Sequence, residues 1–259
     1  MQTTTIHPTA IVDPSARLGR GVSVGPFCLV GPNVEIGEGT ALLERVHVGP
    51  GTQIGRHNRI YPGAIVGTEP QDLKFGGEQS YVRVGDHNTI REYVTINRAT
   101  GEGQATVVGN HNLLMAYCHV AHNSVLYDHV ILANSVQLAG HIVIEDYAIV
   151  GGLVGVHQFV RIGCHAFVGG VSAVNTDILP YAKVTGVPCR PYGINSVGLR
   201  RRGFPEETIK KLKQAYRILH RRGLALDVAL HQLESHYAGV PEVLKIVEFV
   251  RESERGICR

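Results

Sequence analysis

A group of histidines between residues 119 and 158 is the feature of this sequence best suited to chemistry. His122, His141 and His157 lie in this stretch, together with Gly140 and Gln158. Imidazole gains and loses a proton near neutral pH, so it can act as a general base without a metal ion. Titratable residues grouped in a groove are a common signature of a functional site. These five residues are therefore the first candidates for catalysis, provided that the fold brings them together.

The fold is indicated by aliphatic residues that recur every six residues. Each residue whose number is divisible by six, from Ile6 to Val174, is Ile, Leu or Val, except Asp72, Glu78 and Glu102. Side chains alternate between the two faces of a strand, so each aliphatic shares its inward face with the residue two before it. Glycine often follows the aliphatic and would let the chain turn a corner. Units this short cannot bury a hydrophobic face alone, so they must stack, and the sequence predicts an all-β solenoid.

Three such units would close one coil of 18 residues, with successive coils about 4.8 Å apart. Residues that differ by 18 in number would then lie above one another. Gly140 lies over His122 in this arrangement, and Gln158 lies over Gly140. His141 and His157 fall one residue away from that column. We therefore expect all five residues at one edge of three successive coils.

The other histidines favour a structural interpretation. They recur at the same place in the six-residue unit, as is typical of turn residues: His57, His87, His111, His129 and His165. The group of His122, His141 and His157 departs from this repeat position. That departure favours a functional site over a set of turn residues.

Two interruptions of the repeat predict loops. The segments 67–83 and 97–107 are polar, contain turn formers, and include all three positions at which the aliphatic is missing. Loops on a rigid scaffold frequently carry function. We expect both segments to project from the coil.

Composition limits the class of protein. The chain of 259 residues contains no apolar run of membrane-spanning length, and Met1–Pro8 lacks a basic segment followed by an apolar one. The five cysteines form no CxxC pair, which suits a reducing compartment and argues against a cysteine zinc site. These features predict a soluble, cytoplasmic protein without membrane insertion.

The carboxyl-terminal part of the chain follows a different pattern. The repeat stops after Val174, and helical periodicity begins after Phe204, with Pro205 in the first turn and Gly223 at the end of the first helix. Two further helical stretches contain Leu226–Tyr237 and Leu244–Val250. We expect a solenoid domain over residues 1–186 and an α-helical domain over residues 187–259.

The helical domain is basic, with 14 Lys and Arg against 8 Asp and Glu in residues 187–259. Its cations would form a patch that attracts an anionic partner or remains a solvated face: Arg200, Arg201, Arg202, Lys210, Lys211, Lys213, Arg217, Arg221 and Arg222. Nucleic acid is a poor candidate, because the chain has no recognised binding motif and few aromatic residues among these charges.

Several segments, spread over nearly the whole chain and both predicted loops, carry a resemblance to a known family: Gly25–Cys28, Val34–Thr40, Gln71–Lys74, Asn112–His122, Leu138–His141, Val156–Phe159 and Gly198–Phe204. They resemble the UDP-N-acetylglucosamine O-acyltransferases that open lipid A biosynthesis. The resemblance implies a left-handed parallel β-helix, a homotrimer with clefts between neighbouring solenoids, and no cofactor or metal. The implied substrates are UDP-N-acetylglucosamine and a 3-hydroxyacyl chain on acyl carrier protein, an acidic partner for the basic tail.

The resemblance also implies roles for individual residues. His122 matches the general base and Gly140 the backbone amide that stabilises an oxyanion. Substrate-contacting positions are matched by Asp72 and Lys74 on the first predicted loop and by His119, His141, His157 and Gln158. Positions that hold the nucleotide or the acyl donor are matched by Asn195, Arg201 and Arg202.

Gly170 matches the position at which the family sets acyl length, and a glycine there leaves room for a long chain, unless it serves only as a turn residue.

Three positions depart from the family. Asn123 follows the catalytic histidine where an acidic residue is usual, Asn97 replaces a histidine, and Val197 replaces a glutamate. These changes bear on the rate, its pH dependence and the nucleotide contacts.

Other classes of protein share the predicted fold. A hexapeptide-repeat O-acetyltransferase would use acetyl-CoA on a sugar, and a trimeric carbonic anhydrase would hold zinc with three histidines. The repeat by itself is equally compatible with an ice-binding or architectural solenoid. Donor preference and metal analysis would separate these alternatives from the O-acyltransferase.

Overall fold

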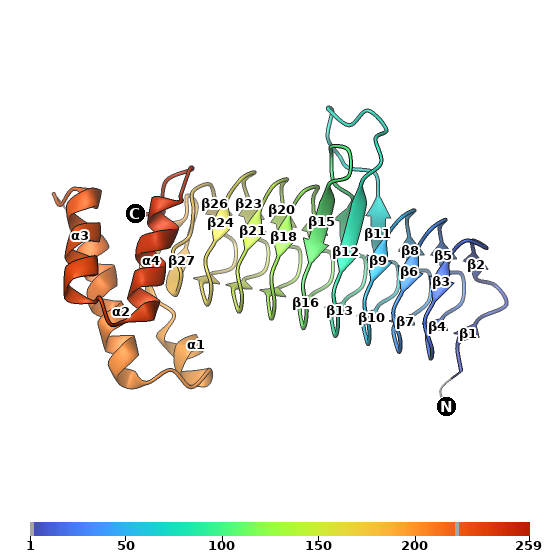
Figure 1. Ribbon diagram of the computed structural model, residues 1–259, viewed down its shortest axis with the longest axis horizontal. Helices are drawn as coiled ribbons and strands as arrows, with labels where there is room; N and C mark the ends of the chain where they lie inside the picture. Colours follow the sequence, from blue (N-terminus) through green and yellow to red (C-terminus); the bar gives the residue numbers. More distant parts are fainter. Residues whose placement is uncertain (1–2, 221–222) are drawn as a thin grey trace.

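The computed structural model describes residues 3–220 and 223–259. It consists of a long solenoid of short strands, followed by helices packed at its carboxyl end (Figure 1). The strands fall into three sheets that run along the solenoid, so each coil has three sides. The predicted solenoid with a helical carboxyl-terminal region is confirmed.

The strands of each sheet are parallel, apart from the final antiparallel pair β27 and β28. The first sheet contains β1 (Thr5–Ile6), β4 (Ser23–Val24), β7 (Ala41–Leu42), β10 (Arg59–Ile60), β13 (Thr89–Ile90), β16 (Leu113–Leu114), β19 (Ile131–Leu132), β22 (Ile149–Val150), β25 (Phe167–Val168), β27 (Ala182–Thr185) and β28 (Arg190–Ile194). The second sheet contains β2 (Ile11–Val12), β5 (Leu29–Val30), β8 (His47–Val48), β11 (Ile65–Thr68), β14 (Thr95–Asn97), β17 (His119–Val120), β20 (Gln137–Leu138), β23 (Gly155–Val156) and β26 (Ala173–Val174). The third sheet contains β3 (Arg17–Leu18), β6 (Glu35–Ile36), β9 (Gln53–Ile54), β12 (Tyr81–Val84), β15 (Ala105–Val108), β18 (Val125–Leu126), β21 (Val143–Ile144) and β24 (Arg161–Ile162).

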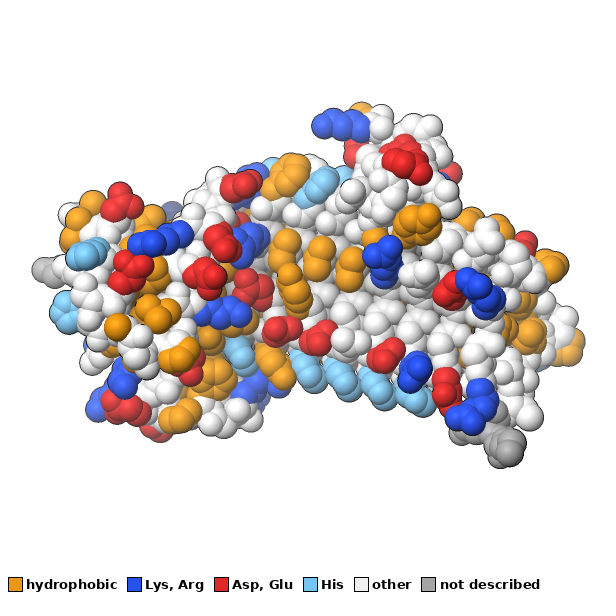
Figure 2. Space-filling view, viewed as in Figure 1, with side chains coloured by type: hydrophobic (Ala, Val, Ile, Leu, Met, Phe, Trp, Pro, Cys, Tyr) orange, Lys and Arg blue, Asp and Glu red, His pale blue; other side chains and the backbone are white. Residues whose placement is uncertain are grey.

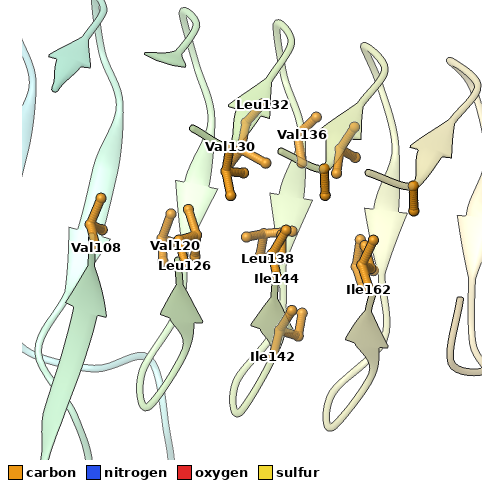
Figure 3. Packing of buried hydrophobic residues seen from close by; sticks show 14 of the residues in the cluster. Val108, Val120, Leu126, Val130, Leu132, Val136, Leu138, Ile142, Ile144 and Ile162 are labelled. Carbon is orange, nitrogen blue, oxygen red and sulfur yellow. The ribbon is translucent and has the colours of Figure 1, made fainter. Parts of the chain in front are cut away.

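The recurring aliphatic residues fill the interior of the coil. Figure 3 shows such side chains, among them Leu126, Leu138 and Ile144, pointing inward from successive coils. All three have 1 % exposure or less, whereas Ile6 at the open amino-terminal end is 49 % exposed. Burying one such side chain contributes about 1.5–3 kcal/mol. The interior of each coil is therefore stabilised by the coils on either side of it.

Glycines that follow the aliphatic residues have a different role from the one expected. Gly25 and Gly37 do not have the left-handed backbone of a turn. A Cβ on Gly25 would lie 2.7 Å from the carbonyl oxygen of Leu43, and a Cβ on Gly37 would lie 2.6 Å from the backbone of Gly55. These glycines permit close approach of adjacent coils. The corner itself is turned two residues later, by residues with a left-handed backbone.

The predicted turn histidines do occupy this left-handed corner position. Their rings form a continuous stack along one edge of the solenoid, from His57 through His87 and His111 to His129, with centroids 4.9–5.0 Å apart. His141 has the same backbone conformation, with φ of 58°, so it shares their place in the repeat. The prediction that His141 departs from this repeat position was wrong.

Both interruptions of the repeat lie at the corner between the second and third sheets, here called the loop corner. One joins β11 to β12 and the other joins β14 to β15, and Figure 1 shows the resulting loops projecting from the solenoid. The four strands extend into the predicted loop segments, so the irregular parts are residues 69–80 and 98–104. The loops are shorter than predicted because their ends continue the ladder between coils.

The helical region contains α1 (Ser196–Arg201), α2 (Glu206–Leu219), α3 (Leu226–His236) and α4 (Pro241–Arg251). Pro205 caps α2 instead of lying in its first turn, and α2 ends before Gly223. The sequence did not indicate α1 or β28. Two of the predicted basic residues, Arg221 and Arg222, lie outside the described residues.

Ion pairs connect α4 to the last coils. Arg161 lies 3.4 Å from Glu145 and 3.2 Å from Glu252, and Lys245 lies 3.7 Å from Glu145. The guanidinium of Arg161 also lies over the Phe249 ring at 4.6 Å.

None of the described helices is both long and apolar enough to cross a membrane.

A prediction about stability follows from the stacking of the coils. Leu132 and Leu18 occupy the same place in the repeat, but Leu132 is fully buried in a central coil and Leu18 is half-buried near the open end. We expect Leu132→Ala to lower the free energy of unfolding by about 3 kcal/mol, since it leaves a cavity that the coils on both sides cannot fill. Leu18→Ala, the control, should cost less than half as much. Urea denaturation measures both values, and equal losses would contradict this account.

Candidate active site

A groove of about 650 Å³ runs over the second sheet to the loop corner. It is open along its length, and polar and apolar side chains of four successive coils line it. The lining residues are Gln71, His119, Ala121, His122, Gln137, Leu138, Ala139, Gly140, Gly155, Val156, His157, Gln158, Ala173, Val174 and Asn175. The predicted column is therefore present: His122, Gly140 and Gln158 share one groove.

The register of the coils explains this arrangement. β17 pairs with β20, and β20 pairs with β23, so that residues 18 apart in the sequence face each other. At the loop corner the His141 N–H donates to the His122 carbonyl at 3.0 Å, and the Phe159 N–H donates to the Gly140 carbonyl at 3.2 Å. The backbone ladder thus places the candidate residues in adjacent coils.

His122 is the most enclosed histidine of the groove, with 6 % exposure. Its Nδ1 lies 2.9 Å from Oδ1 of Asn123, and its Nε2 lies 3.8 Å from a carboxylate oxygen of Asp72. The ring of His141 packs edge-on against it, with centroids 5.3 Å apart. The imidazole is therefore held on three sides, with Nε2 directed toward the loop that carries Asp72.

The hydrogen bonds of Asn123 determine which nitrogen of His122 carries a proton. The Thr100 N–H donates to Oδ1 of Asn123 at 3.0 Å, and Nδ2 of Asn123 donates to the Thr100 carbonyl at 3.0 Å. This pairing sets the orientation of the amide, so the atom facing Nδ1 of His122 is an acceptor. Nδ1 must then donate, which leaves the lone pair of Nε2 free to accept a proton.

Gly140 lies directly against the His122 ring. A Cβ at this position would lie 2.5 Å from Cε1 and Nε2 of His122, so a side chain cannot fit without moving the ring. Within the described parts of the chain, the Gly140 N–H has no hydrogen-bond acceptor. The same place in other coils is occupied by proline, as at Pro32 and Pro50, because the ladder needs no N–H there. The Gly140 N–H is thus available to a bound substrate.

The other two enclosed histidines are kept neutral. Burial, and to a smaller extent the nearby His122, lowers the pKa of His119 and of His141. Nδ1 of His119 also lies 2.7 Å from the Thr95 hydroxyl. His157 is exposed, and its Nδ1 lies 3.1 Å from the Gln158 carbonyl. Neutral imidazoles can donate and accept hydrogen bonds without adding positive charge to the site.

Asp72 lies on the first loop and faces the column. Its carboxylate accepts the Lys74 N–H at 3.0 Å, and this bond is the main reason that the pKa of Asp72 is below its usual range. The charge of Lys74 contributes to lowering the pKa of His141. The structure therefore brings Asp72 and Lys74 to the same corner as the histidines.

Asn195, Arg201 and Arg202 are not part of this groove. Asn195 and Arg201 line a separate cavity of about 450 Å³ over the first sheet, with Phe167, Lys183 and the exposed Val197. Asn195 also caps α1 by accepting the Gly198 N–H at 3.1 Å, and it donates to the His165 carbonyl at 3.0 Å.

Arg202 lies elsewhere again, with its guanidinium 4.0 Å from the centroid of the Tyr147 ring. The predicted basic patch is also partly neutralised. Arg200 pairs with Glu206, and Lys211 lies 3.7 Å from Glu207. The patch is therefore less uniformly positive than its sequence indicates.

Gly170 lies at a different corner from Gly140. It follows β25 and so stands between the first and second sheets, across the face of the second sheet from the loop corner. Its backbone is not left-handed, and a Cβ there would meet the Gly152 carbonyl oxygen at 3.1 Å. Its backbone angles therefore do not require glycine at this position.

Asn97 has its amide committed to the loops. It is 4 % exposed, and Nδ2 donates to the Glu69 carbonyl at 2.9 Å and to the Thr68 hydroxyl at 3.2 Å.

Sequence reasoning missed Gln137, which lies in the groove next to His119 along the same column. The spacing of 18 residues from His119 was the signal that could have identified it.

A parallel solenoid with an oriented histidine and a free backbone N–H at one corner places the chain among the hexapeptide-repeat acyltransferases. Residues 177–258 match the family model described as "Udp N-acetylglucosamine O-acyltransferase; Domain 2". An acyl-[acyl-carrier-protein]–UDP-N-acetylglucosamine O-acyltransferase of Halorhodospira halophila is 49% identical over 99% of this chain and 100% of its own length. The corresponding enzyme of Thermodesulfovibrio yellowstonii is 46% identical over 98% of this chain and 99% of its own length.

Solved structures agree with this assignment. The UDP-N-acetylglucosamine acyltransferase of Bacteroides fragilis superposes with a TM-score of 0.96 at 44% identity, covering 98% of this chain and 100% of its own. The UDP-N-acetylglucosamine acyltransferase of Arabidopsis superposes with a TM-score of 0.88 at 37% identity, covering 98% and 100%. The chain belongs to the family of acyl-[acyl-carrier-protein]–UDP-N-acetylglucosamine O-acyltransferases, and it is an acyltransferase.

The contact between Gly140 and His122 generates a prediction. Gly140→Ala should lower acyl transfer about 100-fold, because the new methyl group pushes the His122 ring out of position while the core of the coil is unchanged. Turnover and thermal unfolding should be measured together. Gly239→Ala is the control, since a Cβ there meets no atom within 4 Å and the residue has no left-handed backbone. Wild-type turnover in Gly140→Ala would mean that the ring position is not critical.

Proposed function

We propose that the protein transfers a 3-hydroxyacyl chain from acyl carrier protein to the 3-hydroxyl group of UDP-N-acetylglucosamine, the first step of lipid A biosynthesis. The names of the relatives supply the acceptor and the carrier protein. The observation that carries the mechanism is the free lone pair of His122 Nε2 in an open groove, beside the unused N–H of Gly140. Cytoplasmic location remains a prediction of the sequence.

In the first chemical step, Nε2 of His122 accepts the proton of the sugar hydroxyl. The hydroxyl oxygen bonds to the thioester carbonyl carbon, and the carbonyl electron pair moves onto oxygen. The Gly140 N–H donates to this oxyanion, an interaction worth about 3 kcal/mol in comparable sites. When the oxyanion collapses, the carbon–sulfur bond breaks, and the imidazolium returns its proton to the thiolate that leaves.

The positive charge that forms on His122 is stabilised by Asp72 instead of by its neighbour in the sequence. Asn123 is neutral and can orient the ring but cannot balance its charge. The carboxylate of Asp72 is 3.8 Å from Nε2 and is kept ionised by the Lys74 N–H. Opposite charges at this distance favour the imidazolium. The departure from an acidic residue at position 123 is thus compatible with a general-base mechanism.

The remaining residues of the groove hold the acceptor. His119, His157 and Gln158 line the groove, and His141 packs against His122 beside it. These side chains present donors and acceptors that can bind the hydroxyl groups of a sugar. Lys74 lies close enough to His141 to affect its protonation and can bind an anionic group at the same corner. We assign these residues and Asp72 to substrate binding.

A homotrimer would unite the two cavities. The groove lies on the second sheet, while Asn195 and Arg201 lie over the first sheet, so one protomer does not present both to one ligand. Hydrophobic side chains gather in the middle of the face seen in Figure 2. On the third sheet, Val107, Val125 and Val143 precede buried residues in adjacent strands and therefore point outward. Packing of solenoids through such faces would bury them and place one protomer's arginines beside another's groove. We assign Asn195, Arg201 and Arg202 to nucleotide or donor binding in that arrangement.

The donor is assigned to the same helical end. Cations on α2 that have no ion-pair partner among the described residues, such as Lys210 and Arg217, can attract an acidic carrier protein. Family membership favours this donor over acetyl-CoA and over the zinc carbonic anhydrase alternative. Among the described residues, no three His, Cys, Asp or Glu side chains of the chain are arranged to hold a metal ion.

The first test of this function measures acyl transfer by the wild-type protein and by a variant that lacks the proposed base. The wild-type protein incubated with UDP-N-acetylglucosamine and 3-hydroxyacyl carrier proteins of varied length should give a product whose mass identifies the transferred chain. His122→Ala should fold normally and lose transfer by at least about 100-fold, because a general base contributes that much or more. Retention of more than about a tenth of the turnover would remove His122 from this role.

A second prediction concerns acyl length. We propose that Gly170 limits the chain, which would then cross the face of the second sheet from the loop corner. Each methylene displaced from a buried position loses about 0.8 kcal/mol, so Gly170→Met should shift preference to donors a few carbons shorter. The rate with short donors should remain, because the thioester end is unaffected. A uniform loss for donors of every length would leave the assignment of Gly170 unsupported.

A further inference from the structure

We propose that Asn123 is a positioning residue that couples the orientation of His122 to the two loops at the loop corner. This inference rests on the proposed function of His122 as the base. Asn123 is part of the coil, but its side chain makes all of its hydrogen bonds to the base and to the second loop. An acidic residue at this position could not make the same set of bonds, because a carboxylate has no donor.

One amide group makes three contacts at this point. Oδ1 of Asn123 accepts from Nδ1 of His122 at 2.9 Å and from the Thr100 N–H at 3.0 Å. Nδ2 donates to the Thr100 carbonyl at 3.0 Å. A carboxylate has no donor and would place negative charge against that carbonyl. The bidentate contact with the Thr100 backbone is therefore specific to asparagine.

The contact continues from the second loop to the first. The Gly101 N–H donates to the carboxylate of Glu78 at 2.7 Å, and the Gly103 N–H donates to the Gln79 carbonyl at 2.8 Å. Glu78 and Gln79 end the loop that carries Asp72. Asn123 thus connects His122 to the second loop, and the second loop in turn is connected by hydrogen bonds to the loop of Asp72.

The charged and titratable groups around His122 make the choice of asparagine consequential. Asp72 on the first loop faces Nε2 of His122, and His141 of the next coil packs against the ring. His119 of β17 lies close enough for His122 to lower the pKa of His119. A second carboxylate at position 123 would favour the protonated imidazole. The base would then be neutral only at higher pH. The neutral amide orients His122 without placing a second negative charge beside it.

The chain provides a matched control for this residue. Asn33 occupies the same place in the repeat near the amino-terminal end, with φ of 55° against 58° for Asn123. Its side chain makes no hydrogen bond to any described residue, and only its backbone N–H is bonded, to Ser15. Substitutions at Asn33 therefore carry the same backbone cost without touching the base or the loops.

The experiment compares Asn123→Ala and Asn123→Asp with Asn33→Ala and Asn33→Asp in the full chain. Amide hydrogen exchange of residues 98–104 reports the loop directly, and the pH profile of turnover reports the base. Both changes at Asn123 should speed exchange in this segment by about tenfold, since each removes at least one bond to Thr100. Neither change at Asn33 should alter exchange there.

The two variants should differ in catalysis. Asn123→Ala should lower kcat about tenfold or more at every pH, because the ring loses its acceptor. Asn123→Asp should keep most of the plateau rate but move the acid limb of the profile to higher pH. Unchanged loop exchange in Asn123→Ala, or a wild-type acid limb in Asn123→Asp, would overturn the proposal. If the wild-type protein transfers no acyl chain, the proposed function fails, while the exchange data still decide whether Asn123 holds the loop.

Discussion

The hydrogen-bond ladder between successive coils is the constraint on which the rest of the structure depends. Successive coils exchange backbone hydrogen bonds at positions set by the repeat: the His119 N–H donates to the Val136 carbonyl of the next coil, and the His141 N–H donates back to the His122 carbonyl. A slip of one residue would turn every inward aliphatic outward, so the hydrophobic interior and the ladder support the same register. Any residue at a corner is therefore aligned with its counterparts in the coils above and below. The site is a consequence of this alignment.

The loop corner combines a rigid frame with backbone groups that the frame does not use. Proline at positions 32 and 50 shows that the position of Gly140 needs no N–H for the ladder. Both loops leave the solenoid at this corner and return to it in the same phase, so their lengths can vary without disturbing the coil. Functional side chains and loops can therefore be accommodated at this corner without altering the core, as is typical of repeat proteins.

The electrostatics of the corner favour one base among several histidines. Burial lowers the pKa of His119 and of His141, so neither adds positive charge at neutral pH. Hydrogen bonding to the Lys74 N–H lowers the pKa of Asp72, whose carboxylate faces Nε2 of His122. A negative charge thus lies on Asp72 beside His122, while the Asn123 amide provides directional hydrogen bonds. The Asn123 amide holds the ring of His122 and the backbone of Thr100 at the same time.

The sequence by itself determined the solenoid, the alignment of His122 with Gly140, and the helical carboxyl end, because burial in strands and helices leaves a periodic trace in the chain. It did not predict α1, the extent of the loops, or the true repeat position of His141. Only the tertiary structure showed that Asn195 caps α1, that Gly170 lies at another corner, and that Asn123 holds Thr100. These contacts join residues through irregular segments, and irregular segments have no period from which a distance can be inferred.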